Sequence, residues 1–182
     1  TSADAITFGT ANVQIADGTL TVNSVGGLID FEGRILGTSD EVLVLNANAA
    51  SDNDSTNEKV VVSLIGNLGE IHSVDITGRD GITLEGGITT SDKASNTASF
   101  TGPVTLNAST IAIDTNAASN DGTITFSSSI DSASSTNRNL DLVSGSANIT
   151  VSGAIGATTA LATLDINTAS ESGDIQLANI GG

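Results

Sequence analysis

The chain has 182 residues, of which 21 are acidic and 5 basic, and its formal net charge at pH 7 is −16. It contains 20 Gly, four Phe and one Pro, but no Cys, Met, Trp or Tyr. Five scattered basic residues cannot make a basic stripe, which argues against a nucleic-acid partner. Without Cys there is no disulfide framework or thiolate metal site, and no stretch is long and apolar enough to insert into a membrane.

Short stretches of alternating apolar and polar residues follow one another along the chain, as in strands with one buried face. In the first part the apolar pairs are Ile6/Phe8, Val13/Ile15, Leu20/Val22, Ile29/Phe31, Leu43/Leu45, Val62/Leu64 and Val74/Ile76. Later pairs are Ile82/Leu84, Val104/Leu106, Ile111/Ile113, Ile124/Phe126, Leu140/Leu142, Ile149/Val151, Leu164/Ile166 and Ile175/Leu177. Helical spacing is nearly absent, so the pattern predicts an all-β protein.

A longer template, Ile29-x-Phe31-x-x-x-Ile35, recurs with the same spacing from Ile82, Ile124 and Ile149. A degenerate repeat of roughly 20–26 residues is typical of solenoid coils. We therefore expect one domain over residues 1–182, a right-handed parallel β-helix of roughly seven to eight coils, with a less regular coil over residues 1–26. A β-sandwich is the alternative, although it usually has longer strands and an aromatic core.

The four Phe are assigned from the same pattern. Phe8, Phe31 and Phe126 occupy apolar positions of the repeat and are expected to point inward. Phe100 lies outside the pattern and is expected to remain free of the core.

The best-matching steps are Gly122-Thr123-Ile124-Thr125-Phe126 with Ile130, Leu140-Asp141-Leu142, and Leu161-Ala162-Thr163-Leu164-Asp165-Ile166. In this repeat pattern, Gly-x-Ile-x-Phe-x-x-x-Ile steps alternate with Leu-x-Leu steps in surroundings rich in Ser, Thr, Asn and Gly. The pattern resembles the filamentous-haemagglutinin-like repeat regions of giant bacterial exoproteins and adhesins. The likeness is one of pattern and covers most of residues 27–182. It implies a secreted, surface-attached or fibrous β-helix.

Catalytic chemistry finds little support. The one His, His72, lies near Glu70 and Ser73, but a general base needs a positioned carboxylate and nucleophile. On a strand, residues 70 and 72 share a face, so we expect an exposed Glu–His pair rather than an active site. We expect no enzymatic activity.

One segment suggests a metal site. Asp52, Asp54, Thr56 and Glu58 place oxygen atoms at alternate positions, as in the first half of an EF-hand loop. The Gly and the distant Glu of that loop are missing, so a solvated acidic loop is the competing interpretation. Calcium is the one cofactor that the sequence suggests.

Together these patterns predict a structural or adhesive module of a bacterial extracellular or cell-surface protein: a stalk, an adhesin body or a head-to-tail filament subunit. The alternative is a calcium- or carbohydrate-binding module on the same scaffold. The C-terminal run from Gly173 stays in the repeat pattern without a polar cap. We therefore expect the ends to contact another coil, either from neighbouring repeats of one longer polypeptide or from a second copy. A carbohydrate or host-surface target is the other partner considered.

Overall fold

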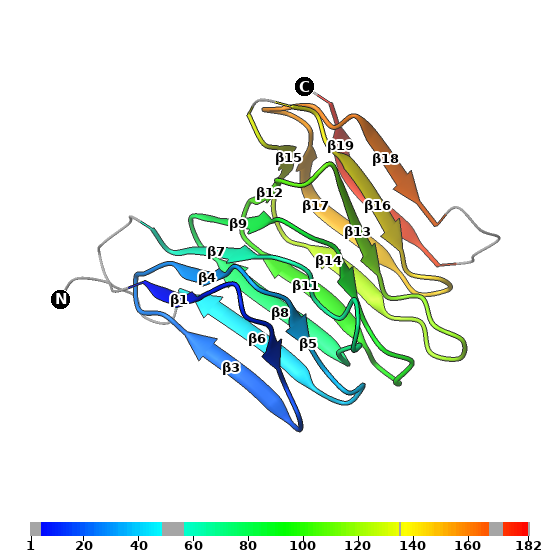
Figure 1. Ribbon diagram of the computed structural model, residues 1–182. Helices are drawn as coiled ribbons and strands as arrows, with labels where there is room; N and C mark the ends of the chain where they lie inside the picture. The colour runs from blue at the N-terminus through cyan, green and yellow to red at the C-terminus, as the bar shows by residue number, and fades with distance from the viewer. Residues whose placement is uncertain (1–4, 49–56, 135, 168–172, 182) are drawn as a thin grey trace.

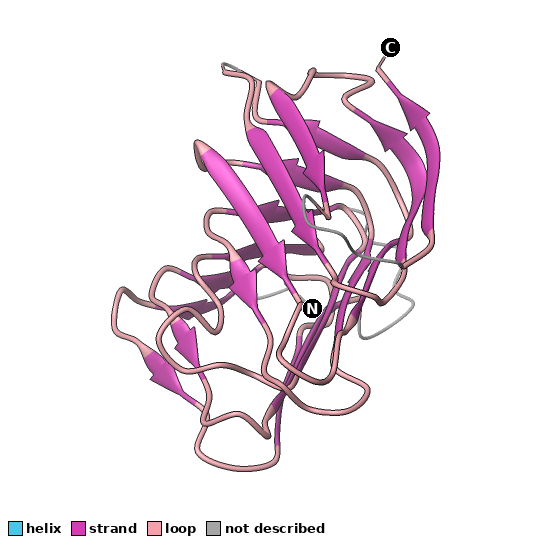
Figure 2. Ribbon diagram, turned by 90° about the vertical axis from the view of Figure 1, so that its right-hand side faces the viewer, coloured by secondary structure: helices cyan, strands magenta, loops and turns pink. Residues whose placement is uncertain are grey.

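The computed structural model describes residues 5–48, 57–134, 136–167 and 173–181. In these ranges the chain forms nineteen strands and no helix (Figure 2), which confirms the all-β prediction. No helix able to cross a membrane occurs among the described residues.

The strands stack as a right-handed parallel β-helix (Figure 1), as predicted. Each turn of the chain passes along three sides, and all strand pairs are parallel and join equivalent strands of successive turns. A β-sandwich is built from antiparallel sheets, so the parallel pairing rules that alternative out.

The first side begins each turn. Its strands are β1 (Ile6–Phe8), β4 (Ile29–Phe31), β7 (Lys59–Val62), β9 (Gly81–Leu84), β12 (Val104–Leu106) and β15 (Ile130–Ser132). One inward residue per turn forms a continuous column: Ile6, Ile29, Val60, Ile82, Val104, Ile130, Ile155 and Ile180. Eight levels mean that seven steps separate Ile6 from Ile180, close to the predicted number of coils.

The strands of the second side range from two to five residues in length. This side consists of β2 (Val13–Gln14), β5 (Ile35–Leu36), β10 (Ile88–Thr89), β13 (Thr110–Asp114), β16 (Asn139–Val143) and β18 (Thr163–Ile166). Single bridges from Ile65 to Ile35 and Ile88 join its lower and upper parts. Its inward column is Val13, Ile35, Ile65, Ile88, Ile113, Leu142 and Ile166.

The third side is a parallel array of seven strands. It consists of β3 (Thr19–Asn23), β6 (Val42–Ala47), β8 (Ser73–Gly78), β11 (Thr97–Thr101), β14 (Thr123–Phe126), β17 (Ile149–Ile155) and β19 (Ile175–Ile180). Its two inward columns run from Leu20 to Ile175 and from Val22 to Leu177. Strands β17 and β19 continue round the corner onto the first side, which makes the first and third sides one sheet.

The core is the stack of these columns. Its aliphatic residues are almost fully buried from Ile29 to Ile155, and each buried Ile, Leu or Val side chain contributes about 1.5–3 kcal/mol relative to exposure. Residues 6–23 carry β1, β2 and β3, each in register with a strand of the next turn.

The assignment of Phe100 was wrong. Phe100 is buried and stacks on Phe126, with ring centroids 4.5 Å apart and planes 11° from parallel. The small residue Ala98 precedes it in the strand, so the alternation there gives a weak signal. Phe8 and Phe31 stack in the same way, 4.1 Å apart, as the inward prediction for both requires.

One predicted apolar pair was shifted by two residues. Val62 is buried as predicted, but its partner inside β7 is Val60, whereas Leu64 is half-buried and lies beyond the strand. Val60 and Val62 lie in register with Ile82 and Leu84 of the next turn.

The repeated template occupies two different corners. From Ile29 and Ile82 it leads from the first side to the second, where it ends at Ile35 and Ile88. From Ile124 it leads from the third side to the first and ends at Ile130. The spacing of the template therefore marks a corner but does not identify which one.

Candidate functional site

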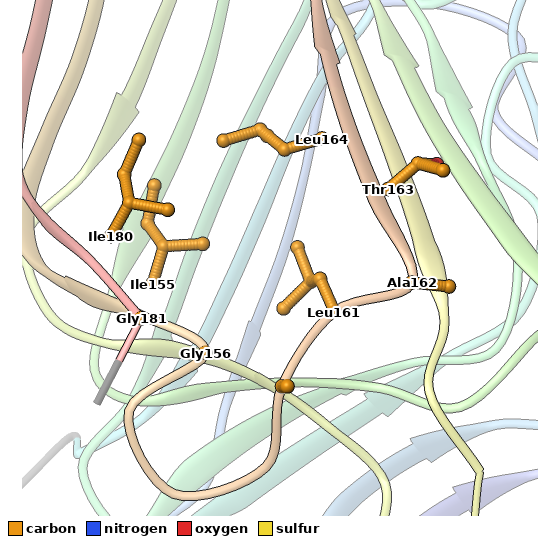
Figure 3. A pocket seen from close by; sticks show the side chains of 9 residues that line it. Ile155, Gly156, Leu161, Ala162, Thr163, Leu164, Ile180 and Gly181 are labelled. Carbon is orange, nitrogen blue, oxygen red and sulfur yellow. The ribbon is translucent and has the colours of Figure 1, made fainter.

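The C-terminal edge of the solenoid exposes apolar side chains. Ile155, Leu161, Leu164 and Ile180 surround a hollow of about 190 Å³ between β17, β18 and β19 (Figure 3). Ile175 and Ile180 are 47% and 63% exposed, whereas their column neighbours one turn earlier, Ile149 and Ile155, are buried. The apolar interior therefore opens at this edge.

The backbone of the C-terminal edge has a defined polarity. Inside the solenoid, inward residues donate their N–H to the following turn, as Val104 does to the Ser129 carbonyl (2.8 Å) and Ile149 to the Asp174 carbonyl (2.9 Å). Inward carbonyls accept from the following turn, as that of Phe100 does from the Ser127 N–H (3.0 Å). Among the described strands β19 pairs only with β17. The N–H and C=O groups of its inward residues therefore point away from the solenoid.

The N-terminal edge is the counterpart. Strands β1, β2 and β3 each pair with one neighbour among the described strands: β4, β5 and β6, respectively. Ile6, Phe8, Val13 and Leu20 are half-buried, because they pack on the core from one side only. By the same polarity, the free backbone groups here belong to outward residues.

Of the four residues of the predicted calcium loop, the structure describes Glu58. Asp52, Asp54 and Thr56 lie outside the described residues. Glu58 has a fully buried side chain whose Oε2 is 3.0 Å from Nη1 of Arg79, and its N–H donates to Oδ2 of Asp80 (3.1 Å). Its other oxygen, Oε1, has no hydrogen-bond partner in the part of the chain that is described. Within that part no group of three or more His, Cys, Asp or Glu side chains is arranged to hold a metal, and the calcium site stays a prediction.

His72 is held by the backbone. Its side chain is half-buried, and Nε2 is 3.2 Å from the carbonyl oxygen of Ala94. Because a carbonyl oxygen only accepts, Nε2 donates its hydrogen there. Glu70 is exposed, two residues earlier on the chain.

Among the described carboxylates Glu41 accepts the most hydrogen bonds, and the sequence analysis did not single it out. Its Oε2 accepts hydrogen bonds from the N–H groups of Thr38 (2.6 Å), Ser39 (3.1 Å) and Asp40 (3.2 Å), and Oε1 accepts from the Thr38 hydroxyl. Burial raises the pKa of Glu41, but these hydrogen bonds outweigh it and hold the pKa below its usual value. The carboxylate therefore closes its own turn and is not free to bind a ligand.

A second buried polar group closes the corner before the third side. The Asn96 side-chain amide donates to the Ser91 carbonyl (2.8 Å) and the Thr90 hydroxyl (3.2 Å). At the same corner of the following turn, the Thr115 hydroxyl donates to the Gly122 carbonyl (2.5 Å). These polar groups fix loops, as buried polar groups usually do.

Acidic side chains on the outer surface differ in their surroundings. Burial raises the pKa of Asp114, and burial together with the charges of Glu32 and Glu85 raises that of Asp30. Hydrogen bonds from Ser146 and from the Ala117 N–H hold the pKa of Asp121 below its usual value. The acids are thus spread over several turns.

At each edge of the solenoid the structure therefore gathers apolar residues. Ile175, Leu177 and Ile180 of the C-terminal edge were part of the predicted repeat. The structure commits Glu41, Glu58 and Asn96 to internal contacts. Comparison of the chain with protein-family models, curated proteins and solved structures finds no match.

Proposed function

We propose that this chain is a structural and adhesive β-helical module of a bacterial extracellular or cell-surface protein, in which it serves as a stalk, an adhesin body or a filament subunit. The observation that carries the proposal is the unbroken register of the first-side column from Ile6 to Ile180. A solenoid of this kind is a rod whose length grows with its number of turns and whose stability is a sum over neighbouring turns.

The surface chemistry supports an exposed, hydrated role. A net charge of −16 keeps such a rod soluble. The resemblance to repeat regions of giant bacterial exoproteins supports the extracellular location. A carbohydrate or host-surface target would bind the outward face of the rod, without nucleic acid, membrane insertion or a catalytic cofactor.

We propose no enzymatic activity for this module, and the contacts of three side chains support that proposal. Glu41 is saturated by its own turn, Glu58 is paired with Arg79, and Nε2 of His72 donates to a carbonyl. None of these three groups is placed to act as a general base on a bound substrate.

Deletion of one turn tests the structural role. Removal of residues 104–129 joins Pro103 to Ile130, which occupies the level of Val104 in the first-side column. This variant should fold with an unchanged strand content per residue. Removal of residues 104–117, about half a turn, is the matched control and should prevent cooperative folding. Equal behaviour of the two variants would reject a modular rod.

Labelling of cells tests the location. An antibody raised against this chain should label intact cells of the source bacterium. Label that appears only after the cells are permeabilised would reject the extracellular assignment.

A calcium-binding module is the second candidate, and the unpartnered Oε1 of Glu58 favours it. Calorimetric titration of the parent with calcium separates the two candidates. A saturable heat that Asp52→Asn and Asp54→Asn abolish would support a calcium site. The absence of heat in the parent would leave the structural module alone.

A further inference from the structure

We infer that the outward face of four internal strands on the third side binds the surface of ice through a regular array of hydroxyl groups. The inference rests on the proposed adhesive function and deepens it, because it names the adhesive face and the partner. The face lies on β8, β11, β14 and β17, which are neighbours in one sheet (Figure 1).

The hydroxyl array has three outward columns that cross these strands in register. They are Ser73, Thr97 and Thr123; Asp75, Ser99, Thr125 and Thr150; and Thr77, Thr101, Ser127 and Ser152. Ser127 and Ser152 belong to the third column because they directly follow Phe126 and Val151, which are paired. All members except Asp75 carry a hydroxyl, and every member is exposed or half-buried.

The hydroxyls of the array are not used within the chain. Hydroxyls that donate hydrogen bonds inside the solenoid lie at its corners, as those of Thr38, Ser91 and Thr115 do. In the part of the chain that the structure describes, the array hydroxyls make no such bond. Each hydroxyl offers one donor and two acceptor positions. The array can therefore bond to a partner outside the chain.

The face is nearly uncharged. Asp75 is the one acid of the array, although the chain has a net charge of −16. The outward columns of the other two sides carry more acids, which are Asp30 and Asp131 on the first side and Asp114, Asp141 and Asp165 on the second. A face that offers many hydrogen bonds and almost no charge suits a neutral, polar partner.

The chemistry of single hydroxyls selects a rigid partner. A hydroxyl that exchanges a bond to liquid water for a bond to another polar group gains little net free energy. A small or flexible ligand would also lose its own freedom on binding. A rigid, periodic partner that meets many hydroxyls at once adds the small gains together. The array is itself rigid, because backbone ladders fix its strands and β-branched Thr side chains have restricted χ1 angles.

The spacing of the array is close to that of ice. Its levels are about 4.8 Å apart, and alternate residues of a parallel strand are about 6.6 Å apart. A tetrahedral network with oxygen–oxygen distances of about 2.75 Å repeats at about 4.5 Å in one direction and at about 7.3 Å along its hexagonal axis. These repeats differ from those of the array by about a tenth or less, so the misfit over four levels is about 1 Å. Ice also presents a hydrogen-bond donor or acceptor at every lattice point.

A crystalline polysaccharide is the competing rigid partner, and the face lacks a group that such a partner needs. Sugar rings present apolar C–H faces, which large, flat aromatic side chains cover well. All four Phe of the chain lie in inward columns, as the pairs Phe8–Phe31 and Phe100–Phe126 show. The array therefore favours ice.

Incorporation into growing ice tests the inference. When ice grows slowly from a dilute solution, solutes that do not bind ice stay in the liquid. The parent should reach a concentration in the ice at least equal to that in the remaining liquid. A parent that stays in the liquid would overturn the inference, whereas the turn deletion and the labelling of cells would still test the structural role separately.

Two double variants test the face. Thr101→Lys with Thr123→Lys places two bulky cations at exposed positions of the array and should lower the amount of protein in the ice severalfold. Thr110→Lys with Thr163→Lys is the matched control, because both residues are exposed and lie on the second side. The control carries the same change of charge and should enter the ice as the parent does. Thermal melts in liquid solution check that both variants keep their fold. An equal loss in both variants would assign the effect to charge and overturn the role of the array.

Sedimentation with insoluble cellulose and chitin tests the competing partner. Neither polysaccharide should retain the parent. Retention that the array variant loses, together with exclusion of the parent from ice, would overturn the inference and assign the face to a crystalline polysaccharide.

Discussion

Phe126 lies directly on Phe100, with ring centroids 4.5 Å apart, although 26 residues of chain separate them. The two rings occupy one inward column of the third side, between Ile76 before them and Val151 after them. The turn between them passes three corners, and the parallel register of β11 and β14 brings the two rings together.

Phe126→Ala should lower the free energy of unfolding by about 3–5 kcal/mol, because it leaves a cavity in the middle of a stack. Phe8→Ala removes the same ring from the half-buried N-terminal edge and should cost clearly less. Urea denaturation followed by circular dichroism measures both midpoints. Equal midpoints for the two variants would contradict the assigned column.

Gly102→Ala should be among the most damaging small substitutions. Gly102 has a φ of +122°, and a Cβ there would lie 1.9 Å from the carbonyl oxygen of Gly78 on the preceding turn. The backbones must separate, which should cost about 4 kcal/mol or more. Gly9→Ala is the control, because nothing lies within 4 Å of a Cβ at Gly9. Thermal melts compare the two variants, and a Gly102→Ala protein as stable as Gly9→Ala would disprove the close approach.

Glu41→Gln should lower stability at pH 7 by about 1–3 kcal/mol, because a charged acceptor of several hydrogen bonds is lost. The folded-state pKa of Glu41 is depressed, so its contribution is complete above the unfolded-state pKa of about 4.3 and is lost as pH falls through the folded value. The difference between parent and variant should therefore shrink in acid. Glu70→Gln, at an exposed position, should match the parent at every pH. A Glu41→Gln deficit that is independent of pH would be inconsistent with a titrating carboxylate.

Salt should raise the melting temperature. The described residues contain two ion pairs, Arg79–Glu58 (3.0 Å) and Lys93–Asp40 (2.6 Å), against a formal net charge of −16. Screening therefore removes more repulsion than attraction between about 0.01 and 0.15 M ionic strength. Measurement at a dilution that keeps the chain monomeric separates this effect from association. A melting temperature that falls steadily over that range would show that attraction dominates.

The fold class could be predicted because apolar and polar residues alternate along a strand with one buried face, so the signal lies in neighbouring residues of the sequence. The assignment of each template to a corner could not. Ile35 and Ile130 end identical spacings, yet Ile35 lies on the second side and Ile130 on the first. Phe100 was missed for a related reason: its partner in the strand is Ala98, and its place in the core depends on Ile76 and Phe126 in other turns.

The candidate surface was only partly predictable. The apolar residues of the C-terminal edge follow from the repeat pattern, since Ile175 and Leu177 alternate like the strands before them. The role of Glu41 does not, because its partners are backbone N–H groups of a turn that folds back onto its side chain. No residue type in the sequence predicts such a turn.

The first-side column also bears on how such a chain can change during evolution. Ile82, Val104 and Ile130 are interchangeable levels of one stack. Unequal recombination between the gene segments that encode two such levels would insert or remove a whole turn and leave every remaining column aligned. The number of turns can therefore change during evolution, as the number of units in a repeated tract does. The requirement for an apolar residue at each inward position stays the same.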